Sequence, residues 1–368
     1  MAVFVCARCE MVLTVPVSRV ALPVHAPFTY GNGMKLRALM QPGTYAVYPE
    51  PTGPPWRRWA EVTPEEAEAH GVFAPVFSLS GGAAGRIALA PGAMSGTAFI
   101  PELCGGGCCG TDGRYGPNLA CLGCGTPVAT RYSDCSIWDE VRLEPDAVRR
   151  VDTDDPEPEP VAWEELADDP DCHHGSPVEP SGNWRPEVVP AVTVALAQVV
   201  AASGGTPVAV PNGRTAELFR SGLDALLGPA PAVGTGQPRT GAAVVAAAGG
   251  PGVPRPAFPV DVLLVPIHPQ TGEVWRPSGR QEGTPAALVP VAAAVWRYLV
   301  HGDPDPLPMP TRGVLPDGLL GDYPLPLHPW PLRPSGAALL HTLARMPAVR
   351  EPWLRAIYDL WKSERYWW

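Results

Sequence analysis

The sequence is poor in lysine and in long hydrophobic runs. Lys35 and Lys362 are the only lysines among 27 basic residues of the 368-residue chain, and no Lys/Arg stripe suited to a phosphate backbone is present. The most hydrophobic stretch, residues 188–202, is shorter than the roughly 20 residues of a membrane helix and contains Pro190 and Gln198. These absences argue against nucleic-acid binding and against a membrane span.

The N-terminus lacks the pattern of a secretory signal peptide. Its first residues contain no basic segment followed by a continuous hydrophobic run, because Cys6, Arg8, Cys9 and Glu10 interrupt it. We therefore expect a soluble, cytoplasmic protein with no membrane partner. In that reducing compartment its nine cysteines are expected to be metal ligands or free thiols rather than disulfides.

The net charge of −10 comes from one segment of the chain. Residues 152–171 contain ten acidic residues and no basic residue, so the other 27 acids balance the 27 bases. Charge of one sign combined with many prolines prevents a segment from burying a core. We expect residues 146–186 to form an acidic Pro-rich linker, in which Trp163 and Leu166 are the residues able to dock locally.

Length and patterning predict two domains and an α+β fold class. A chain of 368 residues with 45% hydrophobic residues is long enough for two cores. Residues 1–145 contain short β-favouring runs separated by Pro, Gly and Asp, which predicts a β-rich cysteine/zinc domain. From residue 187 the pattern changes to longer helices and buried strands. Residues 187–368 are therefore expected to form an α/β layered domain.

Hydrophobic periodicity and turn residues predict the individual elements. In the first domain, strands are expected over residues 11–15, 45–48, 86–89, 97–100 and 127–132, with one helix over 64–70 capped by Thr63. In the second domain, helices are expected over residues 188–203, 214–227, 285–301, 335–346 and 352–361, and strands over 207–210, 241–248 and 260–267.

The strongest signal is a pair of Cys-x-x-Cys motifs in similar surroundings. Cys6 and Cys9 form the first motif, Cys121 and Cys124 form the second, and β-favouring residues flank both. In a zinc knuckle the two thiolates lie about one turn apart, and backbone N–H groups point at the sulfur atoms. Gly125, directly after Cys124, suits the left-handed backbone conformation of such a turn.

These two motifs resemble the zinc-ribbon family, in which two knuckles on neighbouring hairpins supply four cysteines to one tetrahedral zinc ion. The sequence departs from the family in its spacing, because 111 residues separate Cys9 from Cys121 where a compact ribbon has about 15 to 20. Such an insertion is tolerable when it folds by itself, since the cost of loop closure grows logarithmically. The resemblance implies a closed, structural zinc site formed by Cys6, Cys9, Cys121 and Cys124.

Four more cysteines lie close to the second motif in the sequence, and glycines around three of them leave little side-chain bulk to keep their sulfurs apart. They are Cys104, Cys108, Cys109 and Cys135. In one partition these four hold a second zinc ion. In the other, some of them pair with the second motif and leave the first motif with other partners.

Cys108 and Cys109 are adjacent, and adjacent side chains point apart in an extended chain, so one of the two is expected to stay unliganded in that conformation. His25 or His70 is then a candidate to complete the set. Reduced thiols buried without a metal and an iron–sulfur cluster are the alternatives to zinc.

Three features of the second domain are candidates for a small-molecule site. Gly249 and Gly250 follow a predicted strand, but no lysine accompanies them and a connecting loop is the simpler interpretation. Asn212 and Gly213 open a predicted helix, where Asn as an N-cap explains the turn equally well. His268 ends the strongest predicted strand, where α/β folds place ligands, although a structural role is the simpler interpretation.

Two further segments contain residues that bind metals or partners in other proteins. Residues 172–174, Cys-His-His, lie in the acidic segment and are expected to form a solvated loop. Trp353, Ile357 and Trp361 share one face of the last predicted helix and are expected in the core. Trp367 and Trp368 are candidates to dock on the first domain or on a protein partner.

Together these features predict a zinc-binding protein with a structural four-cysteine site, acting as a scaffold or adaptor. One zinc ion is expected and a second has candidate ligands. Whether the protein is an enzyme is left open. The alternatives are an enzyme that acts on a small molecule through the C-terminal α/β domain, and nucleic-acid binding through the zinc-ribbon-like module.

Overall fold

The computed structural model describes residues 1–28, 36–168, 177–179, 182–231, 243–277, 285–302 and 330–364. The chain divides into two compact units. The first comprises Met1–Pro160 with Pro269–Gly272, and the second comprises Val161–His268 with Glu273–Trp368. Helices and sheets are both present, so the predicted α+β class is confirmed.

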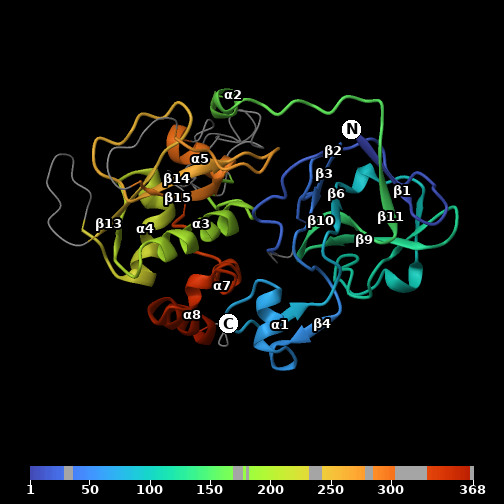
Figure 1. Ribbon diagram of the computed structural model, residues 1–368, viewed down its shortest axis with the longest axis horizontal. Helices are drawn as coiled ribbons and strands as arrows, with labels where there is room; N and C mark the ends of the chain where they lie inside the picture. Colours follow the sequence, from blue (N-terminus) through green and yellow to red (C-terminus); the bar gives the residue numbers. More distant parts are fainter. Residues whose placement is uncertain are drawn as a thin grey trace, which may run out of the picture. The chain divides into compact units, whose positions relative to one another are not determined.

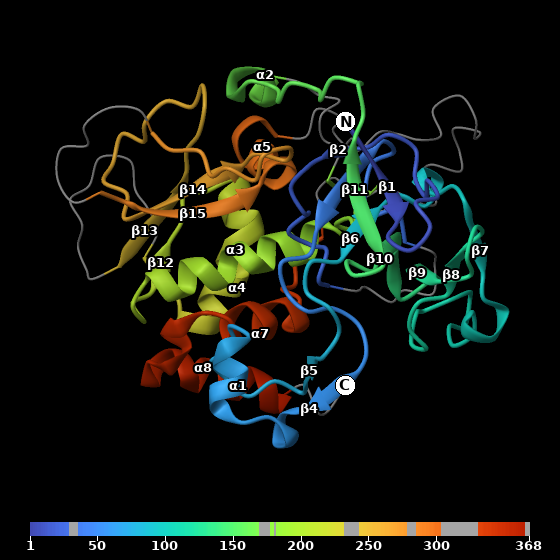
Figure 2. The same ribbon diagram turned by 45° about the vertical axis from the view of Figure 1, so that its right-hand side comes forward.

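A seven-stranded sheet forms most of the first unit. Its strand order is β2-β3-β6-β10-β9-β8-β7, and only β2 and β3 pair in parallel. Figure 2 shows β6, β10, β9, β8 and β7 following one another across this sheet. The strands are β2 (Ser18–Arg19), β3 (Thr44–Val47), β6 (Ile87–Leu89), β7 (Thr97–Phe99), β8 (Leu119–Cys121), β9 (Pro127–Asp134) and β10 (Ile137–Leu143).

The chain's first strand pairs with a strand from the range expected to be linker. β1 (Ala2–Cys6) runs antiparallel to β11 (Val148–Asp152), and Figure 2 shows the two side by side. Residues 148–152 therefore belong to the first unit, while α2 (Trp163–Asp168) belongs to the second. Side chains from this pair and from the large sheet share one hydrophobic core, which includes Phe4, Cys6, Tyr45, Leu89, Leu119, Cys121, Val128, Val141, Leu143 and Val148.

Smaller elements complete the first unit. β4 (Trp56–Arg58) and β5 (Ser78–Ser80) form a two-stranded sheet, and α1 (Pro64–Ala69) begins at the N-cap Thr63 as expected. Residues 11–15, expected to be a strand, make only isolated bridges, at Val12 and Thr14. Three short 3-10 helices are η1 (Trp59–Glu61), η2 (Pro91–Ala93) and η3 (Pro101–Leu103).

The second unit is built on a four-stranded parallel sheet with the order β12-β13-β14-β15. Helix α3 packs against β14 and β15 and lies beside α4, as Figure 1 shows. The strands are β12 (Val208–Ala209), β13 (Val244–Ala248), β14 (Val262–Ile267) and β15 (Ala287–Ala292). The helices are α3 (Val188–Ala202), α4 (Arg214–Leu227), α5 (Ala293–His301), α7 (Gly336–Ala344) and α8 (Pro352–Glu364), with the 3-10 helix η5 (Pro347–Arg350).

The single helix expected over residues 285–301 is instead a strand followed by a helix. β15 occupies residues 287–292 and leads directly into α5. Pro290 explains the difference, because proline inside a helix removes a hydrogen bond and clashes with the preceding turn, whereas an edge strand tolerates it. The flanking Val289 and Val291 are β-branched and suit a strand.

A buried ion pair lies inside the first unit. The Glu140 side chain is 0% exposed and accepts hydrogen bonds from Arg142 Nε at 3.0 Å and from the Tyr48 hydroxyl at 3.1 Å. The Arg142 guanidinium lies between two rings, 4.4 Å from the centre of Tyr48 and 4.5 Å from that of Tyr132. Burial and the Glu140 charge raise the pKa of Tyr48, so its hydroxyl stays protonated and continues to donate.

Substituting Glu140→Gln should destabilise the first unit by about 3–5 kcal/mol, because the buried Arg142 charge loses its counter-ion. The measurement is urea unfolding of the full chain, followed by hydrogen exchange of peptides from residues 1–160. The control is Asp152→Asn in the exposed Arg150–Asp152 pair, which should change stability by less than about 1 kcal/mol. Equal effects of the two substitutions would contradict the buried-pair argument.

Candidate metal centres

The first Cys-x-x-Cys motif forms a tight turn at the end of β1. The Glu10 amide donates to the Cys6 carbonyl at 2.9 Å, and the Cys6 amide donates to the Met11 carbonyl at 2.8 Å. The Met11 amide also hydrogen-bonds to the Cys9 sulfur. Glu10 has a φ of 63°, a left-handed conformation that is unusual for a residue with a side chain.

The second motif, at the end of β8, repeats the same hydrogen bonds. The Gly125 amide donates to the Cys121 carbonyl at 2.8 Å, and the Cys121 amide donates to the Thr126 carbonyl at 2.9 Å. The Thr126 amide hydrogen-bonds to the Cys124 sulfur, and Gly125 has a φ of 72°. Both turns therefore have the knuckle conformation expected from the sequence, with backbone amides directed at sulfur atoms.

The two turns bring four sulfur atoms together, and we call these cysteines the knuckle site. Cys6 Sγ lies 3.6 Å from Cys124 Sγ, Cys9 Sγ lies 3.5 Å from Cys121 Sγ, and all four lie within 4.8 Å of one another. A tetrahedral zinc ion with Zn–S bonds of about 2.3 Å has S–S edges of about 3.8 Å. The spacing and the donor atoms therefore allow the knuckle site to hold a metal ion.

Hydrogen bonds among the thiols of the knuckle site raise the pKa of Cys9 and lower that of Cys124. The Met11 amide acts to lower the pKa of Cys9, but desolvation and the three neighbouring thiols raise it to about 12. At Cys124, the hydroxyl and amide of Thr126 lower the pKa to about 6. Four thiolates at these distances require a cation to offset their charge, and a bound metal ion deprotonates coordinating thiols.

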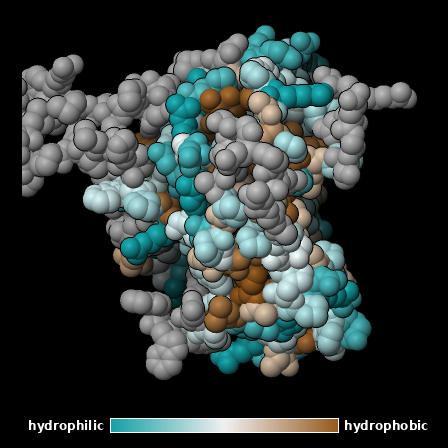
Figure 3. Space-filling model, turned by 90° about the vertical axis from the view of Figure 1, so that its left-hand side faces the viewer, coloured by the Kyte–Doolittle hydropathy of each residue, from teal (hydrophilic) through white to brown (hydrophobic). Residues whose placement is uncertain are grey.

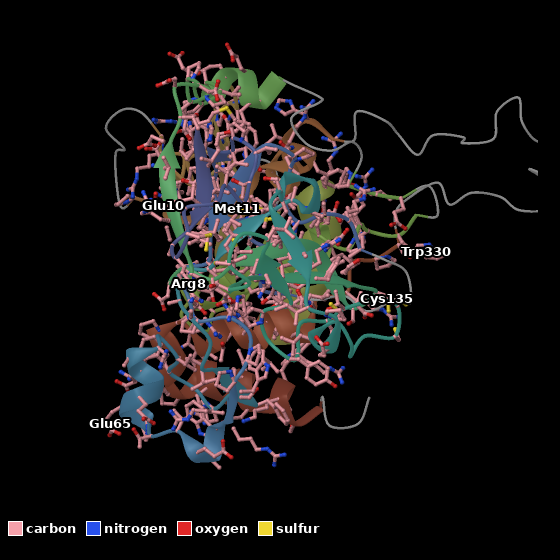
Figure 4. The ribbon with its side chains drawn as sticks, turned by 90° about the vertical axis from the view of Figure 1, so that its right-hand side faces the viewer. Arg8, Glu10, Met11, Glu65, Cys135 and Trp330 are labelled. Carbon is pink, nitrogen blue, oxygen red and sulfur yellow. The ribbon has the colours of Figure 1, made fainter. Side chains whose placement is uncertain are left out.

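A second group of metal-binding side chains consists of Cys108, Cys109, Asp134 and Cys135, and we call it the loop site. Cys108 Sγ lies 3.1 Å from Cys135 Sγ and 3.4 Å from Cys109 Sγ. Cys108 and Cys109 lie in the glycine-rich loop after η3, whereas Asp134 ends β9 and Cys135 lies in the turn before β10. Figure 4 shows Cys135 well separated from Arg8 and Met11 of the first knuckle.

Asp134 is a loop-site member that the sequence analysis did not include. Its Oδ2 accepts a hydrogen bond from the Cys109 amide at 2.9 Å, and its Oδ1 accepts from the Ser136 amide at 3.2 Å and the Ser136 hydroxyl at 3.0 Å. The Cys109 amide, together with Ser136, holds the pKa of Asp134 below its usual range despite burial. Asp134 is therefore an ionised, buried carboxylate beside three thiols.

Cys104 and the two histidines considered with it lie outside both groups. The Cys104 thiol donates to the Ile100 carbonyl at 3.1 Å, so Asp134 rather than Cys104 is the fourth member of the loop site. The His25 ring packs on Trp138, and His70 ends helix α1. The Cys-His-His segment at 172–174 lies outside the described residues.

In the second unit, the glycine loop after β13 is occupied by a tryptophan. The Trp296 indole donates to the Gly249 carbonyl at 2.7 Å, and a Cβ atom at Gly250 would overlap the Trp296 ring. These glycines therefore allow close packing of α5 on the loop. This arrangement agrees with a connecting loop rather than a phosphate-binding one.

His268 and Asn212 are also held by neighbouring groups. His268 is 3% exposed, its Nε2 lies 2.8 Å from the Val161 carbonyl, and its ring contacts Trp163 edge to face. The N-cap of α4 is Gly213, and the Asn212 side chain accepts a hydrogen bond from Arg220 at 2.8 Å, so Asn212 is not the cap considered from the sequence.

The aromatic residues of α8 are only partly in the core. Leu354 and Tyr358 are fully buried, while Trp353, Ile357 and Trp361 are half-buried. The two last tryptophans, Trp367 and Trp368, lie outside the described residues.

On the face drawn in Figure 3, hydrophobic residues occur in separate patches among hydrophilic ones.

Comparison with known protein families, with curated proteins and with solved structures gave no match to this chain. The resemblance to zinc ribbons therefore remains a similarity of two knuckles. Among the described residues, no helix has the length and hydrophobicity needed to cross a membrane.

The two left-handed positions of the knuckles can be tested by substitution. Glu10→Gly should be more stable than Glu10→Ala by about 1 kcal/mol, because both remove the exposed ion pair with Arg149 and only Ala keeps a Cβ atom at positive φ. Gly125→Ala should lower stability by a similar amount. Thermal unfolding of the full chain is the measurement, and equal stabilities of the two Glu10 variants would contradict the left-handed assignment.

Proposed function

We propose that the chain is a zinc-binding protein in which the knuckle site holds one structural zinc ion through four thiolates. The observation that supports this is the convergence of four sulfur atoms from two turns with the same backbone hydrogen bonds. Four thiolates complete a tetrahedral shell, so no coordination position remains for water or a substrate. The zinc ion is therefore structural rather than catalytic.

The ion cross-links distant parts of the first unit. It joins the end of β1, in the two-stranded sheet, to the end of β8, in the seven-stranded sheet. Apart from β9 and β10, the strands of this unit are at most five residues long. Short strands bury little surface each, and zinc–thiolate bonds add folding free energy that they lack.

We place the protein in the scaffold or adaptor class. Trp296 fills the glycine loop and Trp163 packs on His268, which counts against the enzyme alternative at these two positions. Nucleic-acid binding through the zinc-ribbon-like module would need Arg8, Arg131 and other arginines on one exposed face. Arg8 is exposed, but Arg131 pairs with Asp139 and is largely buried. A protein partner at the aromatic C-terminus stays a prediction.

Removing zinc should unfold the first unit and leave the second folded. The full chain, purified with zinc under reducing conditions, is treated with EDTA at a urea concentration that the zinc-loaded protein withstands. Peptides from the first unit's strands should lose hydrogen-exchange protection, while those from α3, α4, β14, α5 and α8 keep it. A large effect is expected, because structural zinc binding contributes about 10–16 kcal/mol in zinc-finger peptides.

A double variant tests which thiols are responsible. Cys9→Ser with Cys124→Ser should bind one zinc ion fewer per chain and should lose protection without a chelator. Cys104→Ser is the control, because its thiol lies outside both metal groups. Zinc-free protein after gentle purification, or a double variant that keeps its zinc, would refute the proposal.

A further inference from the structure

The loop site differs from the knuckle site in its donor atoms and in its exposure. It combines three sulfur atoms with one carboxylate, and zinc accepts both kinds of ligand. Cys108 and Cys109 are exposed, whereas Asp134 and Cys135 are buried. In the knuckle site Cys9 is exposed, Cys124 is half-buried, and Cys6 and Cys121 are buried. One side of the group therefore faces solvent, and its other side is fixed to the β9–β10 hairpin.

Two glycines allow the loop to pack closely against this hairpin. A Cβ atom at Gly107 would overlap Asp134 Oδ2, and one at Gly110 would overlap the Ser133 carbonyl oxygen. The Ser133 amide donates to the Thr111 carbonyl at 2.8 Å, which fixes the register of loop and hairpin. The approach of Cys108 and Cys109 to Cys135 is therefore a property of the fold.

The adjacent cysteines do not point apart, as an extended chain would require. Residues 108–110 form a bend, and the Cys108 and Cys109 sulfur atoms lie 3.4 Å from each other. Both thiols can therefore reach one ion together with Cys135.

The hydrogen bonds of Asp134 select one of its oxygens as a ligand. Oδ1 accepts hydrogen bonds from the amide and the hydroxyl of Ser136, which use both of its lone pairs, and the Cys135 thiol makes a longer contact with it at 3.6 Å. Oδ2 accepts one, from the Cys109 amide, and keeps a lone pair. The same amide orients the carboxylate, as groups around a metal ligand commonly do.

We propose that the loop site binds a second zinc ion through the thiolates of Cys108, Cys109 and Cys135 and through Asp134 Oδ2, and that it releases this ion faster than the knuckle site does. Binding displaces three thiol protons to solvent. Release is faster because two ligands are exposed to water and competing chelators, and because a carboxylate holds zinc less tightly than a fourth thiolate does. The loop site is thus an exchangeable site for thiophilic divalent cations, and the comparison of release rates rests on the zinc ion proposed for the knuckle site.

The test measures zinc release from the full chain. The protein is loaded with two equivalents of Zn²⁺ under anaerobic, reducing conditions and freed of excess metal, and the chelator 4-(2-pyridylazo)resorcinol is added. Two phases of equal amplitude are expected. Cys108→Ser with Cys135→Ser should remove only the fast phase, and Cys104→Ser should remove neither phase.

Two single variants keep the test informative if the Cys108→Ser, Cys135→Ser double variant fails to fold. Cys109→Ser changes an exposed side chain and should also abolish the fast phase while the slow phase persists. Asp134→Asn should keep both phases but speed the fast one about tenfold or more. The proposal is overturned by a single phase of one zinc ion, by two phases that survive in Cys109→Ser, or by a Cys108–Cys135 disulfide, two hydrogens lighter, in protein prepared under these conditions.

Discussion

The structure of the first unit depends on bringing two sulfur-bearing turns together from opposite ends of a long insertion. Cys6 and Cys121 are themselves members of the hydrophobic core that joins β1 to the seven-stranded sheet. Packing therefore places one cysteine of each pair, and the identical backbone turns place the other. A metal ion bound there would stabilise an arrangement that the hydrophobic core already favours, and it would lock the start of the chain to β8.

The two cysteine groups reach similar sulfur spacings by different routes. In the knuckle site, each turn is formed by hydrogen bonds between residues close in sequence, and its amides are directed at sulfur. In the loop site, a glycine-rich loop is pressed on a hairpin, and the members come from two segments that have no common motif. The first route gives four like ligands, of which Cys9 is exposed, and the second gives a mixed set with two exposed members.

This difference also decides how much could be predicted from the sequence. The knuckle pairs were predictable because a four-residue spacing encodes the turn, and the longer helices of the second unit followed from hydrophobic periodicity. Several strands, among them β10 at the centre of the large sheet, were not expected, because their hydrophobic patterns are short or interrupted by charged residues. Asp134 was not predictable, since only the loop's approach makes it a neighbour of Cys109. Glu140 and Arg142 alternate along a strand, a pattern that normally indicates a solvent-facing side, yet they are buried because Tyr48 and Tyr132 enclose the pair.

The second unit shows why position in a fold does not by itself imply a site. Its parallel sheet has loops at the carboxyl ends of β13 and β14, where such sheets often bind ligands. In this chain an indole ring enters one of these loops, and a buried histidine at the other is fixed by a carbonyl and a second indole. Both positions are satisfied by the protein's own groups, whereas the sulfur atoms of the two cysteine groups converge on one another. Within the described residues, the chemistry that calls for an external ligand is therefore concentrated at the two cysteine groups.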